Sequence, residues 1–127
     1  MLEKDFVPYE EALALKELGF DEPCNTCYDK LEMVASYGAS VFDYKNYNTS
    51  GYMVSRPTFS QAFRWFREKH NLNPLIAFCE YAIESENAWK YTLDNPTKIL
   101  MWDGKFNTYE EAELACLKKL IEISKNK

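Results

Sequence analysis

The stretch from Ser55 to His70 gathers the side chains best suited to hold an anion. Its sequence, SRPTFSQAFRWFREKH, combines arginines with aromatic residues around the start of an expected helix. Guanidinium groups bind carboxylate or phosphate oxygens in pairs, helix N-termini attract anions, and aromatic rings stack on bases. With nearby tyrosines, this pattern predicts a binding surface for a small nucleotide-like anion. The predicted ligand-binding residues are Arg56, Arg64, Trp65, Arg67, Tyr47 and Tyr52.

Two other interpretations of these residues stay open. Arg64 and Arg67 are also explained as solvated surface charges, with Trp65 at the rim of the core. The tyrosine-rich stretch that carries Tyr44, Tyr47 and Tyr52 also holds Asn, Ser and Gly, which is the composition of adaptable contact loops. It favours, as an alternative function, a protein–protein inhibitor or adaptor.

Residue patterns typical of catalysis are missing from the sequence. It contains no G-x-S-x-G, P-loop, G-x-G-x-x-G or H-E-x-x-H motif, and its single histidine, His70, cannot form a multi-histidine metal site. Most paired acids, such as Glu10 and Glu11, stand in first helical turns, where they stabilise the helix dipole. We therefore expect a non-enzymatic protein without a cofactor. The 20 acidic residues leave a metal-dependent nucleotide hydrolase as a second alternative.

The four cysteines, Cys24, Cys27, Cys79 and Cys116, predict buried reduced thiols. Cys24 and Cys27 form a C-x-x-C pair that could supply two zinc ligands, but no second close pair accompanies it. A redox dithiol is less favoured still, because no βαβ pattern surrounds the motif.

Three segments have helix signals that would position these side chains. Pro8 opens a first helix that ends at Gly19. Thr58 and Gln61 form a capping box for a second helix, which buries an apolar stripe and runs to Asn71. A third helix follows a capping box of Thr108 and Glu111, and its expected buried face consists of Tyr109, Ala112, Cys116, Leu120 and Ile123.

Strands are expected between the helices. Residues 41–54 resemble a hairpin or a long tyrosine-bearing loop, and residues 75–83, 89–95 and 98–104 resemble an antiparallel meander. Turn signals fall at 85–87, 95–96 and 103–104. The predicted fold class is α+β: a single domain over residues 1–127, with a small antiparallel sheet of about three to five strands packed with about three helices.

Composition narrows the classes of partner. A net charge of −5 disfavours long nucleic acids, and the sequence has neither a long apolar run for a membrane nor a signal peptide. A cytoplasmic location is therefore expected. The aromatic content of 16% exceeds the needs of a core this size, which favours a contact surface and is compatible with a homo-oligomer.

Three blocks of the chain, PYEEALALKELGFDEPC, PTFSQAFRWFREKHNL and YEEAELACLKKLIEI, resemble a family of short uncharacterised proteins of tailed bacteriophages and prophages. The resemblance implies a viral accessory protein in the bacterial host cytoplasm, active in host takeover or anti-defence. Its ligand would then be a nucleotide immune signal that it sequesters, or its partner a host protein. No catalytic residues are known in that family, and residues 25–53 depart from its pattern.

Overall fold

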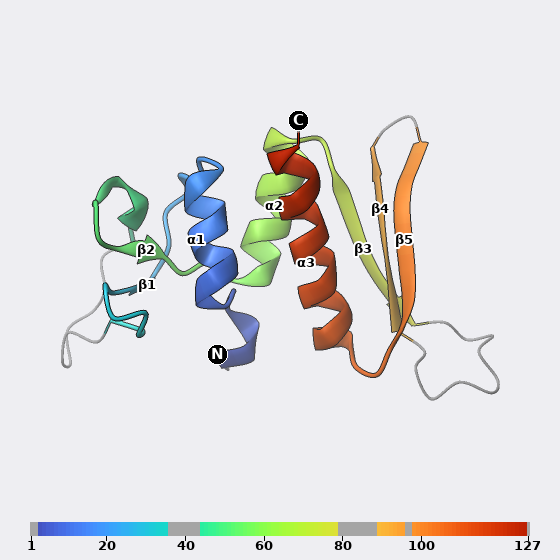
Figure 1. The fold of residues 1–127 in the computed structure, drawn as a ribbon, viewed down its shortest axis with the longest axis horizontal. Helices are drawn as coiled ribbons and strands as arrows, with labels where there is room; N and C mark the ends of the chain where they lie inside the picture. The colour runs from blue at the N-terminus through green and yellow to red at the C-terminus, as the bar shows by residue number, and fades with distance from the viewer. Residues whose placement is uncertain (1–2, 36–43, 79–88, 96–97, 127) are drawn as a thin grey trace. The chain divides into compact units, whose positions relative to one another are not determined.

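The computed structural model describes residues 3–35, 44–78, 89–95 and 98–126. These residues form helices and antiparallel strands, so the fold class is α+β, as predicted (Figure 1). The chain divides into two compact units, Met1–Ala62 and Phe63–Lys127, which are described separately below. No helix of the described residues is long and apolar enough to cross a membrane.

The first unit contains helix α1 (Tyr9–Glu17) and a short antiparallel ribbon of β1 (Cys27–Tyr28) and β2 (Val54–Ser55). A single 3-10 turn, Tyr47–Thr49, stands in the segment expected to be a hairpin or a loop. Helix α1 contacts β2. The interior of this unit is apolar, and its fully buried side chains include Val7, Leu15 and Phe20.

Helix α1 begins and ends where its sequence signals predict. Pro8 is the N-cap residue, and Gly19 has a φ of 97°, a value that side chains with a Cβ rarely adopt. The Phe20 N–H donates to the Leu15 carbonyl at 2.9 Å, and the Gly19 N–H donates to the Lys16 carbonyl at 3.0 Å. This pair of bonds is the Schellman arrangement, which satisfies the last carbonyls of a helix.

Helix α2 (Phe59–Lys69) also starts as predicted, because the Thr58 hydroxyl accepts a hydrogen bond from the Gln61 N–H at 3.2 Å. The other half of the capping box is not formed. The Gln61 amide instead donates to the Pro23 carbonyl at 2.6 Å, which is a tertiary contact. The helix ends before Asn71, whose positive φ of 57° breaks the helical path.

The second unit contains the predicted meander, formed by β3 (Asn73–Phe78), β4 (Trp89–Asn95) and β5 (Lys98–Phe106) in the order β3-β4-β5. Pro74 lies in edge strand β3, where the missing N–H is tolerated. The turn expected at residues 103–104 is wrong: β5 continues through it, and the register shifts between its pairs with Trp89 and Tyr91. An extra residue in β5 therefore forms a β-bulge at the place where the Asp-Gly pair had predicted a turn. The signal at residues 85–87 lies outside the described residues.

Helix α3 (Tyr109–Lys125) contacts all three strands of this sheet. Its cap is as predicted, since the Thr108 hydroxyl accepts from the Glu111 N–H at 3.1 Å. The buried face differs from the expected one, because Tyr109 is 41% exposed and Ile123 is only partly buried. The buried positions are Ala112, Cys116, Leu117, Leu120, Ile121 and Ser124. A 17-residue helix on a sheet buries a broader stripe than one row of residues.

The described strands therefore belong to two antiparallel sheets, of two and three strands, where one sheet was expected. The larger sheet is at the lower end of the expected size. Strands β1 and β2 are each two residues long and pair with each other, so they form a ribbon separate from the three-stranded sheet.

Candidate functional site

The ribbon of β1 and β2 fixes the position of Arg56. Cys27 is paired with Ser55 and Tyr28 with Val54, and one step further the Arg56 N–H donates to the Thr26 carbonyl at 3.0 Å. Side chains alternate between the two faces of a strand, and opposite residues share a face. The side chains of Thr26, Tyr28 and Arg56 therefore lie on one face of the ribbon.

Two aromatic rings enclose the Arg56 guanidinium. Its central carbon lies 4.0 Å from the centroid of the Phe6 ring and 5.6 Å from that of Tyr28. Phe6 is brought here by a bridge between Phe6 and Thr58 and by a 2.9 Å hydrogen bond from the Val7 N–H to the Pro57 carbonyl. We call Phe6, Thr26, Tyr28 and Arg56 the arginine cage.

The cage leaves polar atoms of Arg56 and Thr26 without partners. Arg56 is only 8% exposed, and its Nε is buried with no hydrogen-bond partner. The Thr26 hydroxyl is also buried with no hydrogen-bond partner. The Tyr28 hydroxyl is satisfied, because it donates to the Val7 carbonyl at 2.6 Å. In the described part of the chain, no carboxylate forms an ion pair with Arg56.

A buried cation without an anion is unfavourable, since burial removes hydration that only a partner charge or hydrogen bonds replace. The rings compensate in part, because a desolvated cation–π contact stabilises by about 2 kcal/mol. The terminal nitrogens of Arg56 are not among the enclosed atoms, in contrast to Nε. The arrangement can therefore accept an anionic oxygen at the outer edge of the guanidinium.

The opposite face of the ribbon has its polar groups paired. The Ser55 hydroxyl accepts from the Tyr47 N–H at 2.9 Å, and the Ser55 N–H donates to the Asn48 side-chain carbonyl at 2.8 Å. The Asn48 amide in turn donates to the Phe20 carbonyl at 2.9 Å. These bonds hold β2, and with it Arg56, in place.

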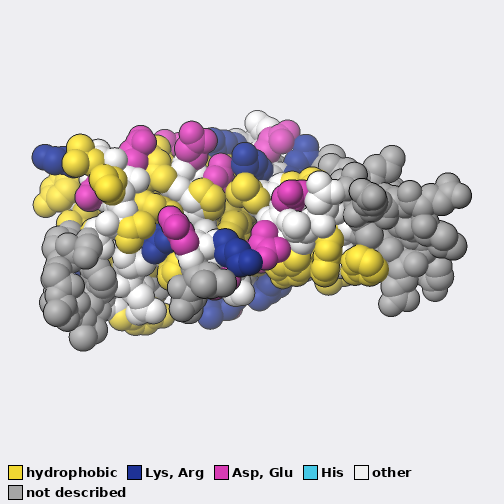
Figure 2. Space-filling view, turned by 90° about the horizontal axis from the view of Figure 1, so that it is seen from below, with side chains coloured by type: hydrophobic (Ala, Val, Ile, Leu, Met, Phe, Trp, Pro, Cys, Tyr) yellow, Lys and Arg dark blue, Asp and Glu magenta, His cyan; other side chains and the backbone are white. Residues whose placement is uncertain are grey.

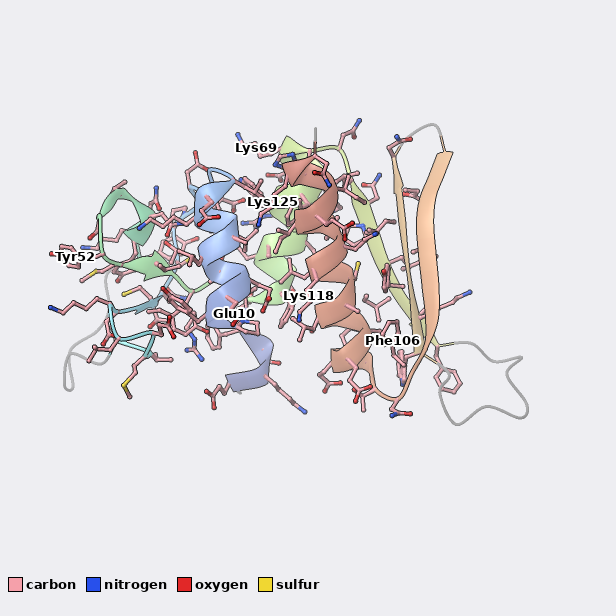
Figure 3. The ribbon with its side chains drawn as sticks, in the orientation of Figure 1. Glu10, Tyr52, Lys69, Phe106, Lys118 and Lys125 are labelled. Carbon is pink, nitrogen blue, oxygen red and sulfur yellow. The ribbon has the colours of Figure 1, made fainter. Side chains whose placement is uncertain are left out.

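The two predicted tyrosines have opposite environments. Tyr47, at 4% exposed, packs in a small core with Cys27 and Ala35, so its ring is not available as a contact anchor. Tyr52 is 65% exposed, and Figure 3 shows it pointing away from the ribbon. Tyr44 is similarly exposed, at 64%.

The remaining predicted residues lie in the second unit. Arg64 and Arg67 are on the exposed side of α2, as expected. Trp65 is 3% exposed, and its ring packs edge-on against Phe66 at 5.1 Å and His70 at 4.8 Å. This burial corrects the expectation of Trp65 as an accessible stacking platform. The six predicted residues are thus divided between the two units, and a surface common to all of them stays a prediction.

The cysteines described by the structure are buried free thiols. Burial raises the pKa of Cys24 and of Cys116 to about 12 and also raises that of Cys27. Such thiols are protonated at neutral pH and are poor nucleophiles. Across the described ranges, no group of three or more His, Cys, Asp or Glu side chains is placed to hold a metal ion, and Cys79 lies outside those ranges.

The sequence prediction identified Arg56 but missed the residues that surround it. Phe6 stands just before the first helix, where a ring is usually a packing residue. Thr26 and Tyr28 lie in a stretch with no clear hydrophobic period. Only the pairing of β1 with β2 reveals that they share a face with Arg56.

Comparison with family models, curated proteins and solved structures finds no match to this chain.

Proposed function

We propose that this chain is a non-enzymatic binding protein that sequesters a small anionic, nucleotide-like ligand, with Arg56 contacting one of its oxyanion groups. The observation that carries the proposal is an arginine, Arg56, that is only 8% exposed and whose guanidinium has no carboxylate partner among the described residues. A phosphate or carboxylate group would supply the missing counter-charge, and hydrogen bonds to charged groups stabilise by about 1.5–3 kcal/mol.

The surroundings of Arg56 favour a small ligand of low charge. Residues 1–62 contain ten Asp and Glu against five Lys and Arg, so the whole net charge of −5 falls on this unit. A polyanion would be repelled by this excess. Because little of Arg56 is exposed, it can contact one phosphate or carboxylate, while the rest of the ligand lies on the surface outside the cage.

Titration calorimetry against inorganic phosphate, pyrophosphate, nucleoside monophosphates and cyclic nucleotides would test the proposal. Arg56→Met removes the charge and keeps the length of the side chain, and we expect it to weaken binding about 10- to 150-fold. Lys118→Met is the control, since Lys118 is an exposed cation of helix α3 in the second unit and belongs to no predicted site. It should bind as the wild type does.

A thermal-shift series provides the second readout. A ligand that binds only the folded state at a concentration of about 100 times Kd stabilises it by about 2.7 kcal/mol. We expect this shift in the wild type and its loss in Arg56→Met. If no member of the panel binds, or if Arg56→Met binds as tightly as the wild type, the proposal is wrong.

The resemblance to phage and prophage proteins suggests a biological setting for this binding. In a bacterial cytoplasm, the ligand would be a nucleotide immune signal and the effect would be anti-defence. Infection of hosts that carry nucleotide-signalling defences, with and without the wild-type chain, would test this setting. Arg56→Met should then remove the protection of the phage.

A second candidate function is an inhibitor or adaptor that binds a host protein through exposed tyrosines. Tyr44 and Tyr52 are both well over half exposed, and tyrosine anchors are common at protein interfaces. Tyr47 no longer belongs to this set, because it is buried. In a binding experiment with host proteins, Tyr52→Ala should release the partner and Arg56→Met should retain it.

A further inference from the structure

The turn that follows β1 exposes three apolar side chains within four residues of the chain. Leu31 is 70% exposed, Met33 63% and Val34 40%. Single exposed apolar residues are ordinary on protein surfaces, but adjacent ones form a patch of the kind that marks interaction sites. We call residues 29–34 the apolar turn. On the face drawn in Figure 2, hydrophobic and acidic side chains of the chain are interspersed.

Hydrogen bonds hold the apolar turn in one conformation. The Asp29 carboxylate accepts from the Leu31 N–H at 2.8 Å and from the Met33 N–H at 3.2 Å, and the Asp29 N–H donates to the Met33 carbonyl at 2.8 Å. Below the turn, the Ala35 N–H donates to the Cys27 carbonyl at 2.9 Å, which ties the turn to β1. The exposed side chains are therefore presented by an ordered backbone, so less entropy is lost on binding.

Glu32, whose N–H closes the turn by donating to the Asp29 carbonyl at 3.0 Å, adopts a φ of 64°. This left-handed conformation is unfavourable for a residue with a Cβ, by about 1–2 kcal/mol. A glycine at this position would remove the strain but also the negative charge. The strained residue therefore carries a carboxylate between the exposed Leu31 and Met33.

The charges distinguish among the surfaces that an apolar turn could bind. Asp29 and Glu32 outweigh Lys30 within the turn, and the unit around it has the entire acidic excess of the chain. An anionic membrane would be repelled. Contact with the same turn of a second copy would bring like charges together, which also opposes binding. A basic surface with an apolar depression is complementary to the turn in both charge and hydrophobicity.

We propose that the apolar turn docks into an apolar pocket bordered by lysines or arginines on another protein. Leu31 and Met33 supply the buried contacts, while Glu32 supplies the charge that orients the partner. This binding is separate from the arginine cage, because Leu31, Met33 and Glu32 have no part in holding Arg56.

Selection from a random peptide library displayed on phage, with the full chain immobilised, would test the proposal. We expect enriched peptides to combine lysine or arginine with a large apolar residue. Synthetic copies should lose about 10-fold or more in affinity for the double variant Leu31→Ser/Met33→Ser. Leu75→Ser is the matched control, since Leu75 is a 59% exposed leucine of the second unit, and it should leave affinity unchanged.

Salt dependence separates the two contributions. Between about 50 mM and about 300 mM NaCl, binding of the wild type should weaken, because exposed charge pairs are screened. Glu32→Gln should reduce this salt dependence. Leu31→Ser should lower the affinity and leave the salt dependence unchanged. Because these side chains are exposed, the melting temperatures of all variants should match that of the wild type.

Four outcomes would overturn the proposal. The first is that the wild type enriches no peptides beyond those that the double variant enriches. The second is that the enriched peptides are acidic or uncharged. The third is binding of the wild type, but not of the double variant, to phosphatidylglycerol vesicles, which would make the turn a lipid contact. The fourth is sedimentation of the wild type as a dimer that the double variant abolishes, which would make the partner a second copy.

Discussion

The guanidinium of Arg56 lies 4.0 Å above the ring of Phe6, although 50 residues separate them in sequence. A cation this close to a ring and largely removed from water should be coupled to it energetically. In a double-mutant cycle of Phe6→Leu and Arg56→Met, we expect a coupling free energy of about 0.5–2 kcal/mol, measured by urea unfolding. Additive changes would mean that the ring only fills space.

Trp65 should now behave as a core residue. Because it is 3% exposed, Trp65→Ala should lower the free energy of unfolding by about 3–5 kcal/mol, a loss that could prevent folding at this protein size. Arg67→Ala, two residues further along the exposed side of the same helix, is the control and should change it by less than about 0.5 kcal/mol. Melting curves of both variants would decide, and a mild effect of Trp65→Ala would reopen its role as a ligand contact.

Asn48 should be sensitive to the loss of one donor. Its amide donates to the Phe20 carbonyl while its carbonyl accepts from the Ser55 N–H. Asn48→Asp keeps the acceptor and places a negative charge against the Phe20 carbonyl, so we expect a loss of about 1–3 kcal/mol in urea unfolding. Asn25→Asp makes the same change at an exposed position and should be nearly neutral. Equal effects of the two changes would indicate a general response to added negative charge.

The two non-glycine residues with positive φ among those described should respond differently to glycine. Glu32→Gly relieves a conformation that glutamate tolerates poorly, so it should stabilise the fold by about 0.5–1 kcal/mol. Asn71→Gly should have a smaller effect, because asparagine is among the residues that best tolerate this region. A larger gain at Asn71 than at Glu32 in chemical denaturation would contradict this reasoning.

The buried thiols predict a loss of stability at alkaline pH. Burial raises the pKa of Cys116 from 9.0 to about 12, so the folded state keeps a proton that the unfolded state releases. The contribution of the neutral thiol is complete below pH 9.0 and declines as pH rises toward 12. The decline should approach about 1.4 kcal/mol per pH unit for each such thiol.

Unfolding free energies from about pH 8 to about pH 11 would test this for Cys116→Ala against the wild type. The variant begins less stable because of the cavity, but its curve should be less steep above pH 9.0. Parallel curves would show that other groups cause the alkaline loss. The same comparison applies to Cys24, whose pKa is also raised to about 12 by burial.

Signals within a few residues were enough to predict the helices. Pro8 and Gly19 bound α1, and the hydroxyls of Thr58 and Thr108 cap α2 and α3, because caps depend on hydrogen bonds between near neighbours in sequence. The meander was predictable for a related reason, since strands that are consecutive in the chain are also neighbours in the sheet. The turn at residues 103–104 was not, because pairing with β4 kept the chain extended there.

The candidate site depended on contacts between distant segments. The sequence by itself determined that Arg56 stands just before a helix, and that Arg64 and Arg67 lie on its polar side. Only the tertiary structure decided that Arg56 and Trp65 are buried while Tyr52 stays exposed. Local periodicity assigns a side chain to a face of its own element, but whether that face meets water depends on which segment packs against it. For Arg56 that segment contains Phe6, and no pattern of residue spacing in the sequence predicts that the two side chains are in contact.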